Sequence, residues 1–339
     1  MLQSLVFITG STGFIGSHVV LQTLNAGYKV LLSVRKEPQI EGLKKLFSDH
    51  VSDIDFVVIP DLSISNAFDS ALKDVEYVFH IASPMPGKGN DFKKEYLNPA
   101  VQGTTAVLDA AEKVSTIKRV VIVSSVLALV QLDAMVTGNM DVKEGLNHTI
   151  AVDPGMEFPE DPVASGGLKY HASKILAHRA TLEWVAANKP HFVVVTLHPS
   201  MVFGRNLSQT SPDGVDGTNA MLWGTLYSET PLFPAVAVDV RDVARAHVSV
   251  LDTDFEGKNN EVQEFIISAG EKDGWSWTNV AKFVKNEYPS LGTKLEGSFD
   301  PPPSIKTPRA EEILGLKWKT MEDTIASFLD HQVELGAQL

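Results

Sequence analysis

Two side chains four residues apart could carry out acid–base chemistry together. Tyr170 and Lys174 lie in the segment KYHASK. Residues i and i+4 are neighbours on one face of a helix, so the two would lie side by side if this segment is helical. A nearby ammonium would lower the pKa of the phenol from its ordinary value of about 10, and Tyr170 could then protonate a developing alkoxide near neutral pH. Taken alone, the pair leaves open a surface helix with chance spacing.

The glycine-rich segment TGSTGFIG, residues 9–16, predicts a dinucleotide site. It follows the apolar run 5–8 and precedes an apolar, helix-like stretch, so it lies at a strand-to-helix turn. Gly10 permits a tight turn, Gly13 lets the backbone approach a pyrophosphate, and Gly16 allows the helix to pack closely. Free N–H groups at the start of the helix would then bind the anion.

The residues after the second predicted strand favour NADP(H) over NAD(H). A ribose 2′-hydroxyl is normally held by an Asp or Glu at this place, whereas a 2′-phosphate favours a guanidinium. The strand is followed by Arg35 and Lys36, and the first carboxylate is Glu37. Arg35 is expected to bind the phosphate, with Lys36 or the later Lys44 as a second cation. An ordinary solvated turn is the alternative.

Apolar strand-like runs alternate with helical stretches over the first 200 residues. This rhythm predicts an α/β fold with a doubly wound parallel sheet, the Rossmann fold, because strands that are apolar throughout are buried on both faces. The expected strands are 5–8, 29–34, 56–59, 77–81, 119–123 and 192–197. The expected helices are 13–26, 64–73, 91–113 with Pro99 bending it or marking its start, and 165–188.

The alternation ends after residue 200, where Pro, Gly and Ser gather in 199–235. We expect a smaller C-terminal α/β lobe that binds substrate, with a helix after Asp242, a strand near 261–268 and helices near 275–284 and 320–333. The predicted domains are a dinucleotide-binding domain over 1–200, completed by about 236–255, and a substrate-binding lobe made of 201–235 and 256–339.

Composition restricts the partners of this 339-residue chain. Its net charge of −13 disfavours nonspecific binding to nucleic acid or to an anionic membrane, because either would be repelled. There are no cysteines, which excludes disulfides and thiolate metal sites, and no His/Asp/Glu cluster has metal-ligand spacing. No apolar run has the length of a membrane span. We expect a cytoplasmic monomer or homodimer without a metal, a membrane or a nucleic-acid partner.

Several segments together resemble the extended short-chain dehydrogenase/reductase family. The resemblance covers nearly the whole chain and is nearest to its dihydroflavonol-4-reductase-like branch, especially microbial NADPH-dependent carbonyl (methylglyoxal or aldehyde) reductases. The matching segments are TGSTGFIG (9–16), PDL (60–62), FHIASP (79–84), VIVSSV (121–126), YHASK (170–174), HPSMVFG (198–204) and VDVRDVARAH (238–247).

The resemblance implies a role for each member of a catalytic group. Tyr170 would be the proton donor, Lys174 would orient the nicotinamide ribose and lower the Tyr pKa, and Ser125 would anchor the carbonyl. Ser125 is preferred to Ser124, which is expected to contact the cofactor; a helix cap or a turn is the alternative for either hydroxyl. The implied cofactor contacts are Gly10, Ser11, Thr12, Gly13, Phe14, Ile15, Gly16, Arg35, Lys36, Asp61, Leu62, Ala82, Ser83, Ser124, Tyr170, Lys174, Pro199 and Val202, although Asp61 could instead cap a helix.

The chain also departs from the family pattern. Ala100 stands where members of the family carry an Asn. Val130 stands where plant flavonoid reductases carry an Asn that binds the flavonoid, and Leu168-Lys169 replaces the Asn-Trp of cinnamoyl-CoA reductases. No acid follows Ser125, which disfavours dehydration. The substrate wall is expected to be apolar, although any of its members could be a plain core residue: Met85, Val126, Val130, Met201, Trp223 and Leu226.

These patterns predict an NADPH-dependent reductase of aldehydes and ketones, an oxidoreductase that acts on CH–OH and carbonyl groups of apolar or aromatic substrates. One alternative is a hydroxysteroid- or sugar-nucleotide-type dehydrogenase or epimerase of the same family, which would favour NAD and ligands rich in hydroxyls. The other is a non-catalytic NADPH-sensing binding protein, which would not need Tyr170 and Lys174.

Overall fold

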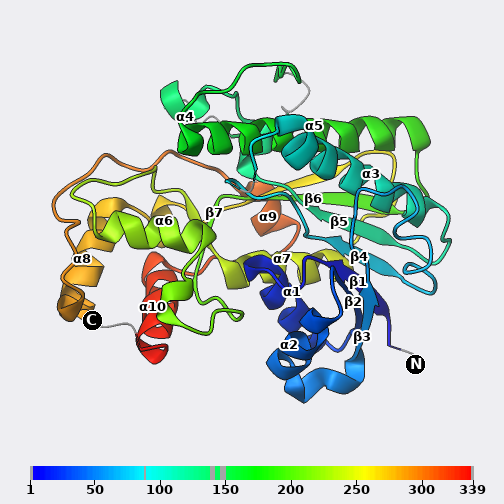
Figure 1. The fold of residues 1–339 in the computed structure, drawn as a ribbon, viewed down its shortest axis with the longest axis horizontal. Helices are drawn as coiled ribbons and strands as arrows, with labels where there is room; N and C mark the ends of the chain where they lie inside the picture. The colour runs from blue at the N-terminus through cyan, green and yellow to red at the C-terminus, as the bar shows by residue number, and fades with distance from the viewer. Residues whose placement is uncertain (1–2, 88, 138–141, 146–149, 337–339) are drawn as a thin grey trace.

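A seven-stranded parallel sheet forms the centre of the molecule (Figure 1). The computed structural model describes residues 3–87, 89–137, 142–145 and 150–336. The strand order is β3-β2-β1-β4-β5-β6-β9, and every neighbouring pair is parallel. The strands are β1 (Leu5–Thr9), β2 (Lys29–Val34), β3 (Ile54–Val58), β4 (Tyr77–His80), β5 (Arg119–Val123), β6 (Val193–Pro199) and β9 (Gln263–Ile267).

Helices cover both faces of this sheet. In Figure 1, α3 (Asn98–Glu112) and α5 (Pro162–Asn188) lie on one side of it, and α1 (Phe14–Asn25) and α7 (Val240–Asp252) lie on the other. The sequence of β1 explains why both faces are covered, since Val6 and Ile8 pack into one buried cluster and Phe7 into the other. Successive side chains of a strand point to opposite faces, so an uninterrupted apolar strand needs a layer on each side.

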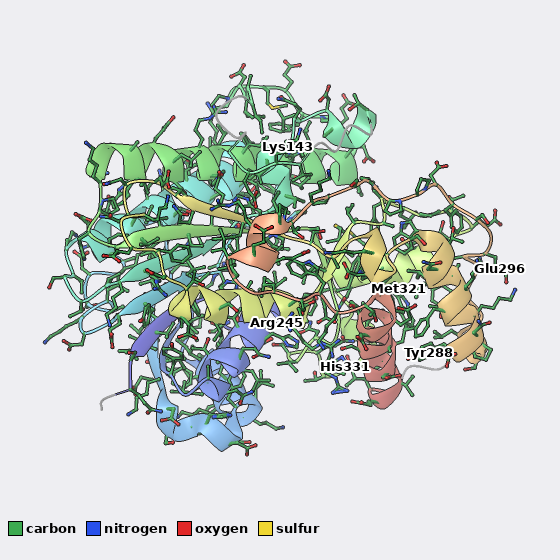
Figure 2. All side chains as sticks on the ribbon, turned by 180° about the vertical axis from the view of Figure 1, so that it is seen from behind. Lys143, Arg245, Tyr288, Glu296, Met321 and His331 are labelled. Carbon is green, nitrogen blue, oxygen red and sulfur yellow. The ribbon has the colours of Figure 1, made fainter. Side chains whose placement is uncertain are left out.

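A third buried cluster lies beyond the sheet, among α6 (Gly217–Leu226), α8 (Trp277–Glu287) and α10 (Met321–Glu334). Two short parallel strands, β7 (Met201–Phe203) and β8 (Ala237–Asp239), adjoin it. Met321 at the start of α10 is fully buried there, and the Tyr288 hydroxyl donates to Asp330 Oδ1 at 2.7 Å (Figure 2). The Arg245 guanidinium of α7 donates to the Lys317 carbonyl and so ties the segment before α10 to the sheet-covering helices.

The remaining described elements are short or lie at the edges. They are α2 (Pro38–Leu46), α4 (Ala134–Thr137), α9 (Pro308–Glu312), a π-helical turn over Lys93–Leu97, and 3₁₀ turns over Ser48–Asp53, Val126–Leu129, Pro212–Gly214, Glu271–Asp273 and Pro289–Leu291. Within the described residues, no helix combines the length and apolar character needed to cross a membrane.

The predicted fold class is confirmed, and each strand predicted for the sheet is present within a few residues of its expected bounds. The strand predicted near 261–268 was expected in the smaller lobe, but it is β9 and pairs with β6 in this sheet. The helix predicted over 64–73 is wrong. Consecutive turns replace it, with bonds such as Ala67 N to the Ile64 carbonyl, because Ser65, Asn66 and Asp69 belong to the residue types that compete with a helix for backbone hydrogen bonds. The predicted boundaries of the two domains stay a prediction.

The helix predicted over 91–113 is present but irregular. Helical backbone begins at Phe92, and the π-helical turn over Lys93–Leu97 leads without a break into α3. Proline cannot donate a backbone hydrogen bond, and the wider π-helical turn lies directly before Pro99. Pro99 therefore lies within the helical segment, next to its irregular turn, and does not mark the start of that segment.

Candidate active site

The candidate site residues gather at the carboxyl ends of the central strands. The glycine turn follows β1, Ala82 and Ser83 follow β4, and Ser124 and Ser125 follow β5. The order of the strands reverses between β1 and β4. In doubly wound sheets, ligands bind at this edge and at this reversal.

The geometry of the glycine turn fits a pyrophosphate. Gly10 has φ of +75°, and a Cβ there would lie 2.8 Å from the Ala82 nitrogen. A Cβ on Gly16 would lie 2.0 Å from the Gly10 carbonyl oxygen, so the turn packs tightly against α1. Among the described residues, a Cβ on Gly13 would meet only that oxygen, at 3.4 Å. Gly13 precedes α1, whose start has no side-chain hydrogen bond and no acidic residue in its first turn. A helix start without a side-chain cap keeps free N–H groups that can bind an anion.

Arg35 lies exposed just beyond β2, close to Asp61 beyond β3. The Arg35 and Lys36 amides donate to Gln39 Oε1 at 2.9 and 3.1 Å, which fixes this turn and leaves the guanidinium exposed. Hydrogen bonds from Ser63 lower the pKa of Asp61, and the charge of Arg35 lowers it further. Asp61 therefore caps a turn, where the alternative from sequence expected it to cap a helix, and it also lies close to the cation expected at the 2′-phosphate.

The structure brings Ser125, Tyr170 and Lys174 together. Tyr170 and Lys174 lie one turn apart on α5, and the Lys174 Nζ is 5.6 Å from the centre of the Tyr170 ring. Ser125 caps the 3₁₀ turn that follows β5, where its Oγ accepts a hydrogen bond from the Leu127 amide at 3.2 Å. It also forms a hydrogen bond with the Tyr170 side chain.

Burial controls the pKa values of this group. It raises the pKa of Tyr170 to about 12, and the hydrogen bond from Ser125 lowers that pKa only in part. Burial also lowers the pKa of Lys174 to about 8. Loss of solvation disfavours the charged form of both groups, so the net pKa of Tyr170 lies above its ordinary value. A lowering of that pKa by Lys174 stays a prediction.

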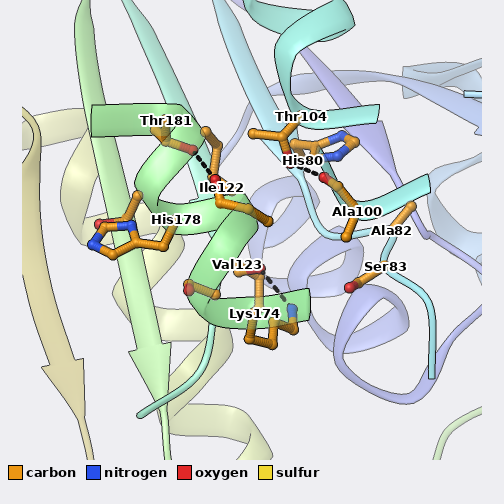
Figure 3. A pocket seen from close by; sticks show the side chains of 13 residues that line it. His80, Ala82, Ser83, Ala100, Thr104, Ile122, Val123, Lys174, His178 and Thr181 are labelled. Carbon is orange, nitrogen blue, oxygen red and sulfur yellow. Dashed lines mark hydrogen bonds between the residues drawn. The ribbon is translucent and has the colours of Figure 1, made fainter. Parts of the chain in front are cut away.

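A small pocket lies behind this group, between α5, α3 and the ends of β4 and β5 (Figure 3). Lys174 enters it and donates to the Val123 carbonyl at 3.4 Å. Ala100 also lines the pocket, and its carbonyl accepts from the Thr104 hydroxyl at 2.8 Å. The remaining lining residues are His80, Ala82, Ser83, Ile122, Ser124, Ala177, His178, Thr181 and Thr196.

Comparison with known proteins identifies the family. Residues 6–142 match the NAD dependent epimerase/dehydratase family. The ketoreductase sphI of Aspergillus fumigatus is 34% identical, with 99% of each chain covered. The chain belongs to the extended short-chain dehydrogenase/reductase family. The ketoreductase CTB6 of Cercospora nicotianae is 32% identical over 85% of this chain and 82% of its own. Among solved structures, Gre2 of Candida albicans in complex with NADPH is 25% identical, with 98% and 99% of the two chains covered and a TM-score of 0.77.

The other residues that the family resemblance assigned to the cofactor lie along the same edge. Ser11 is buried and donates to the Ser33 carbonyl at 3.4 Å, and the exposed Thr12 accepts from Ser208 through its carbonyl at 3.4 Å. Phe14, Ile15, Leu62, Ala82 and Ser83 are partly exposed, whereas Ser124, Pro199 and Val202 are buried.

The residues expected to form the substrate wall lie in different surroundings. Val126 and Val130 are buried in one small cluster after β5. Met201 and Trp223 are partly buried against the third buried cluster, among α6, α8 and α10, and Leu226 is fully buried within it. Met85 is 41% exposed. Their role in substrate binding stays a prediction.

One cluster of three buried polar side chains was not predicted from the sequence. The side chains of His178, His198 and Glu264 lie with their nitrogen and oxygen atoms within 4.8 Å of one another, although the spacing along the chain shows no metal-ligand pattern. His178 Nε2 lies 2.5 Å from Glu264 Oε1. The only sequence signal is that His178 follows Lys174 by four residues, since nothing in the sequence marks residue 264 as a neighbour of α5.

Proposed function

We propose that the protein reduces aldehydes and ketones to alcohols with NADPH. It is an NADP-dependent oxidoreductase. The observation that carries the proposal is the contact of Ser125, Tyr170 and Lys174 beside a glycine turn that is shaped for a pyrophosphate. Arg35 supports the choice of NADP(H), because its guanidinium is exposed where the 2′-phosphate is expected.

Each residue of the group contributes one part of the reaction. NADPH, when bound, supplies the hydride that the carbonyl carbon receives. The Ser125 and Tyr170 hydroxyls donate hydrogen bonds to the carbonyl oxygen and stabilise the charge that develops there. Tyr170 then gives its proton to that oxygen. A phenol whose pKa is about 12 is neutral at physiological pH and so carries the proton that the alkoxide needs.

Lys174 supports Tyr170 as the proton donor. Its ammonium, one turn from Tyr170, would hold the ribose of the cofactor and stabilise the phenolate that remains after proton transfer. Its pKa of about 8 leaves it mostly protonated at neutral pH. The enzyme thus aligns the reactants and stabilises charge, while the cofactor provides the reducing chemistry.

We infer an apolar or aromatic carbonyl compound as substrate, from Val126 and Met201, which follow β5 and β6, and from Trp223 of α6. The names of relatives, two ketoreductases and a methylglyoxal reductase, support a carbonyl compound as the substrate. A cytoplasmic location and a monomer or homodimer stay part of this proposal.

The test is turnover with a panel of carbonyl compounds. NADPH oxidation would be followed with methylglyoxal, aryl ketones, β-keto esters and a dihydroflavonol, with NADH as the matched control. Turnover of small or aryl ketones with NADPH is expected. Preference for NADH together with hydroxyl-rich substrates would contradict the proposal, and tight NADPH binding without any turnover would point to a binding protein.

A further inference from the structure

The imidazole of His198 contacts the backbone of the serine in the active group. His198 lies on β6 and its side chain is fully buried. Its Nδ1 is 3.1 Å from the Ser125 carbonyl oxygen and its Nε2 is 2.9 Å from Thr196 Oγ1. A carbonyl oxygen only accepts, so Nδ1 carries the hydrogen and Nε2 accepts from the threonine hydroxyl. Burial holds the pKa of His198 well below its ordinary value, so the ring is neutral and has a single donor.

Neighbouring side chains fix the orientation of this ring. The His178 ring packs edge-to-face against it, with ring centres 4.6 Å apart. His178 is held in turn by Glu264 Oε1 at 2.5 Å, and Glu264 Oε2 accepts from the Gly145 amide at 2.7 Å. The His198 ring therefore cannot turn without disturbing a hydrogen-bonded chain that runs from α5 to β9.

The backbone at Ser125 determines where its hydroxyl lies. Ser125 has an extended conformation, with φ of −161° and ψ of 154°, between the end of β5 and the 3₁₀ turn that follows. Its carbonyl accepts from the Ala128 amide at 2.9 Å as well as from His198. With two donors on this oxygen, the peptide plane that follows Ser125 is fixed, and the Oγ stays within reach of Tyr170.

We propose that His198 is a positioning residue for Ser125: its Nδ1–H holds the Ser125 carbonyl, and thereby the hydroxyl that binds the substrate carbonyl. The inference rests on the proposed reductase function and deepens it. His198 itself has no contact with substrate or cofactor in this role, and its effect on the reaction passes through Ser125 alone.

Two substitutions at position 198 separate the donor from the bulk of the side chain. In Asn the amide nitrogen is as many bonds from Cβ as Nδ1 is in His, whereas in Gln it corresponds to Nε2. His198→Asn therefore keeps a donor for Ser125, and His198→Gln keeps only a partner for Thr196. We expect kcat to fall about ten- to a hundredfold in His198→Gln, as for other small displacements of reacting groups, and far less in His198→Asn. NADPH affinity should be unchanged in both variants.

Equal kcat in the two folded variants would overturn the proposal. If His198→Gln does not fold, Thr196→Val provides the second test, because it keeps the β-branched shape and removes the hydroxyl that holds the Nδ1–H tautomer. We expect a severalfold lower kcat with unchanged NADPH affinity in that variant, and unchanged kcat there would equally overturn the proposal.

A double variant tests whether His198 acts through Ser125. In a Ser125→Ala background, Thr196→Val should lower the remaining turnover no further, because the hydroxyl that it helps to position is gone. An equal loss in both backgrounds would assign a general structural role instead. Absence of wild-type turnover on the whole carbonyl panel would refute the proposed function, and that outcome is distinct from a failure of the positioning role in an active enzyme.

Discussion

Alanine substitutions at three glycines test the shape of the nucleotide turn. A Cβ on Gly16 would lie 2.0 Å from the Gly10 carbonyl oxygen and 2.7 Å from the Gly10 carbonyl carbon. Contacts under 3.0 Å are essentially never observed, so turn and helix must separate by about 1 Å. Overpacking of this kind costs about 1–3 kcal/mol of stability. The shift also displaces the amides that bind the pyrophosphate, so Gly16→Ala should lower both Tm and NADPH affinity.

Gly13→Ala separates these two effects. Of the atoms in the described part of the chain, its Cβ would meet only the Gly10 oxygen, at 3.4 Å, which is an ordinary contact, so the fold should be unaffected. The added methyl group would instead occupy the open side of the turn, and we expect NADPH affinity to fall more than about tenfold, or 1.4 kcal/mol.

Gly42→Ala is the matched control. Gly42 lies in α2, and no atom of the described residues comes within 4 Å of the added Cβ. This substitution should therefore raise stability by about 0.5–1 kcal/mol and leave NADPH binding unchanged. Thermal unfolding with and without NADPH, and titration of bound-nicotinamide fluorescence, measure both quantities. Unchanged NADPH affinity in Gly13→Ala and Gly16→Ala would refute the assignment of this turn.

Three further predictions concern charged groups. Arg35→Ser should raise the Kd of NADPH about ten- to a hundredfold and leave that of NADH unchanged, because hydrogen bonds to charged groups contribute about 1.5–3 kcal/mol; equal effects on both cofactors would contradict the role of Arg35. The value of kcat/KM for reduction should fall as pH rises above 8, where the Lys174 ammonium loses its proton, and a Lys174→Arg variant should lack this limb. Burial raises the pKa of Asp242 from 3.8 to about 6. Between these pH values the Asp242 carboxyl is ionised in the unfolded chain and still protonated in the folded protein. The free energy of unfolding should therefore fall as pH rises from 4 to 6, by up to about 3 kcal/mol. Urea unfolding of Asp242→Asn should show no such loss of stability, and a pH profile identical to that of the wild type would contradict the role of Asp242.

Local patterns predicted the strands of the sheet well, because β1, β2 and β5 are short apolar runs bounded by turn residues. The glycine turn was equally readable, since its function depends on residues that are adjacent in sequence. The false helix over 64–73 shows the limit of local propensity, because an apolar spacing typical of a helix was overridden by Ser and Asn residues that favour turns.

The environment of the active group could not be read from sequence. Spacing alone placed Tyr170 beside Lys174, but the opposing effects of burial on the two pKa values depend on packing from several elements. The neighbours of His198 come from α5, β9 and the end of β5, and residues brought together only by folding leave no local pattern.

The most direct test of the account compares wild type with Tyr170→Phe. The variant lacks only the phenolic oxygen, which lies by the Ser125 hydroxyl. NADPH oxidation by an aryl ketone would be measured together with NADPH affinity. The account predicts turnover in wild type and its loss in Tyr170→Phe, with NADPH binding retained. Full activity in that variant would contradict the assignment of Tyr170 as the proton donor.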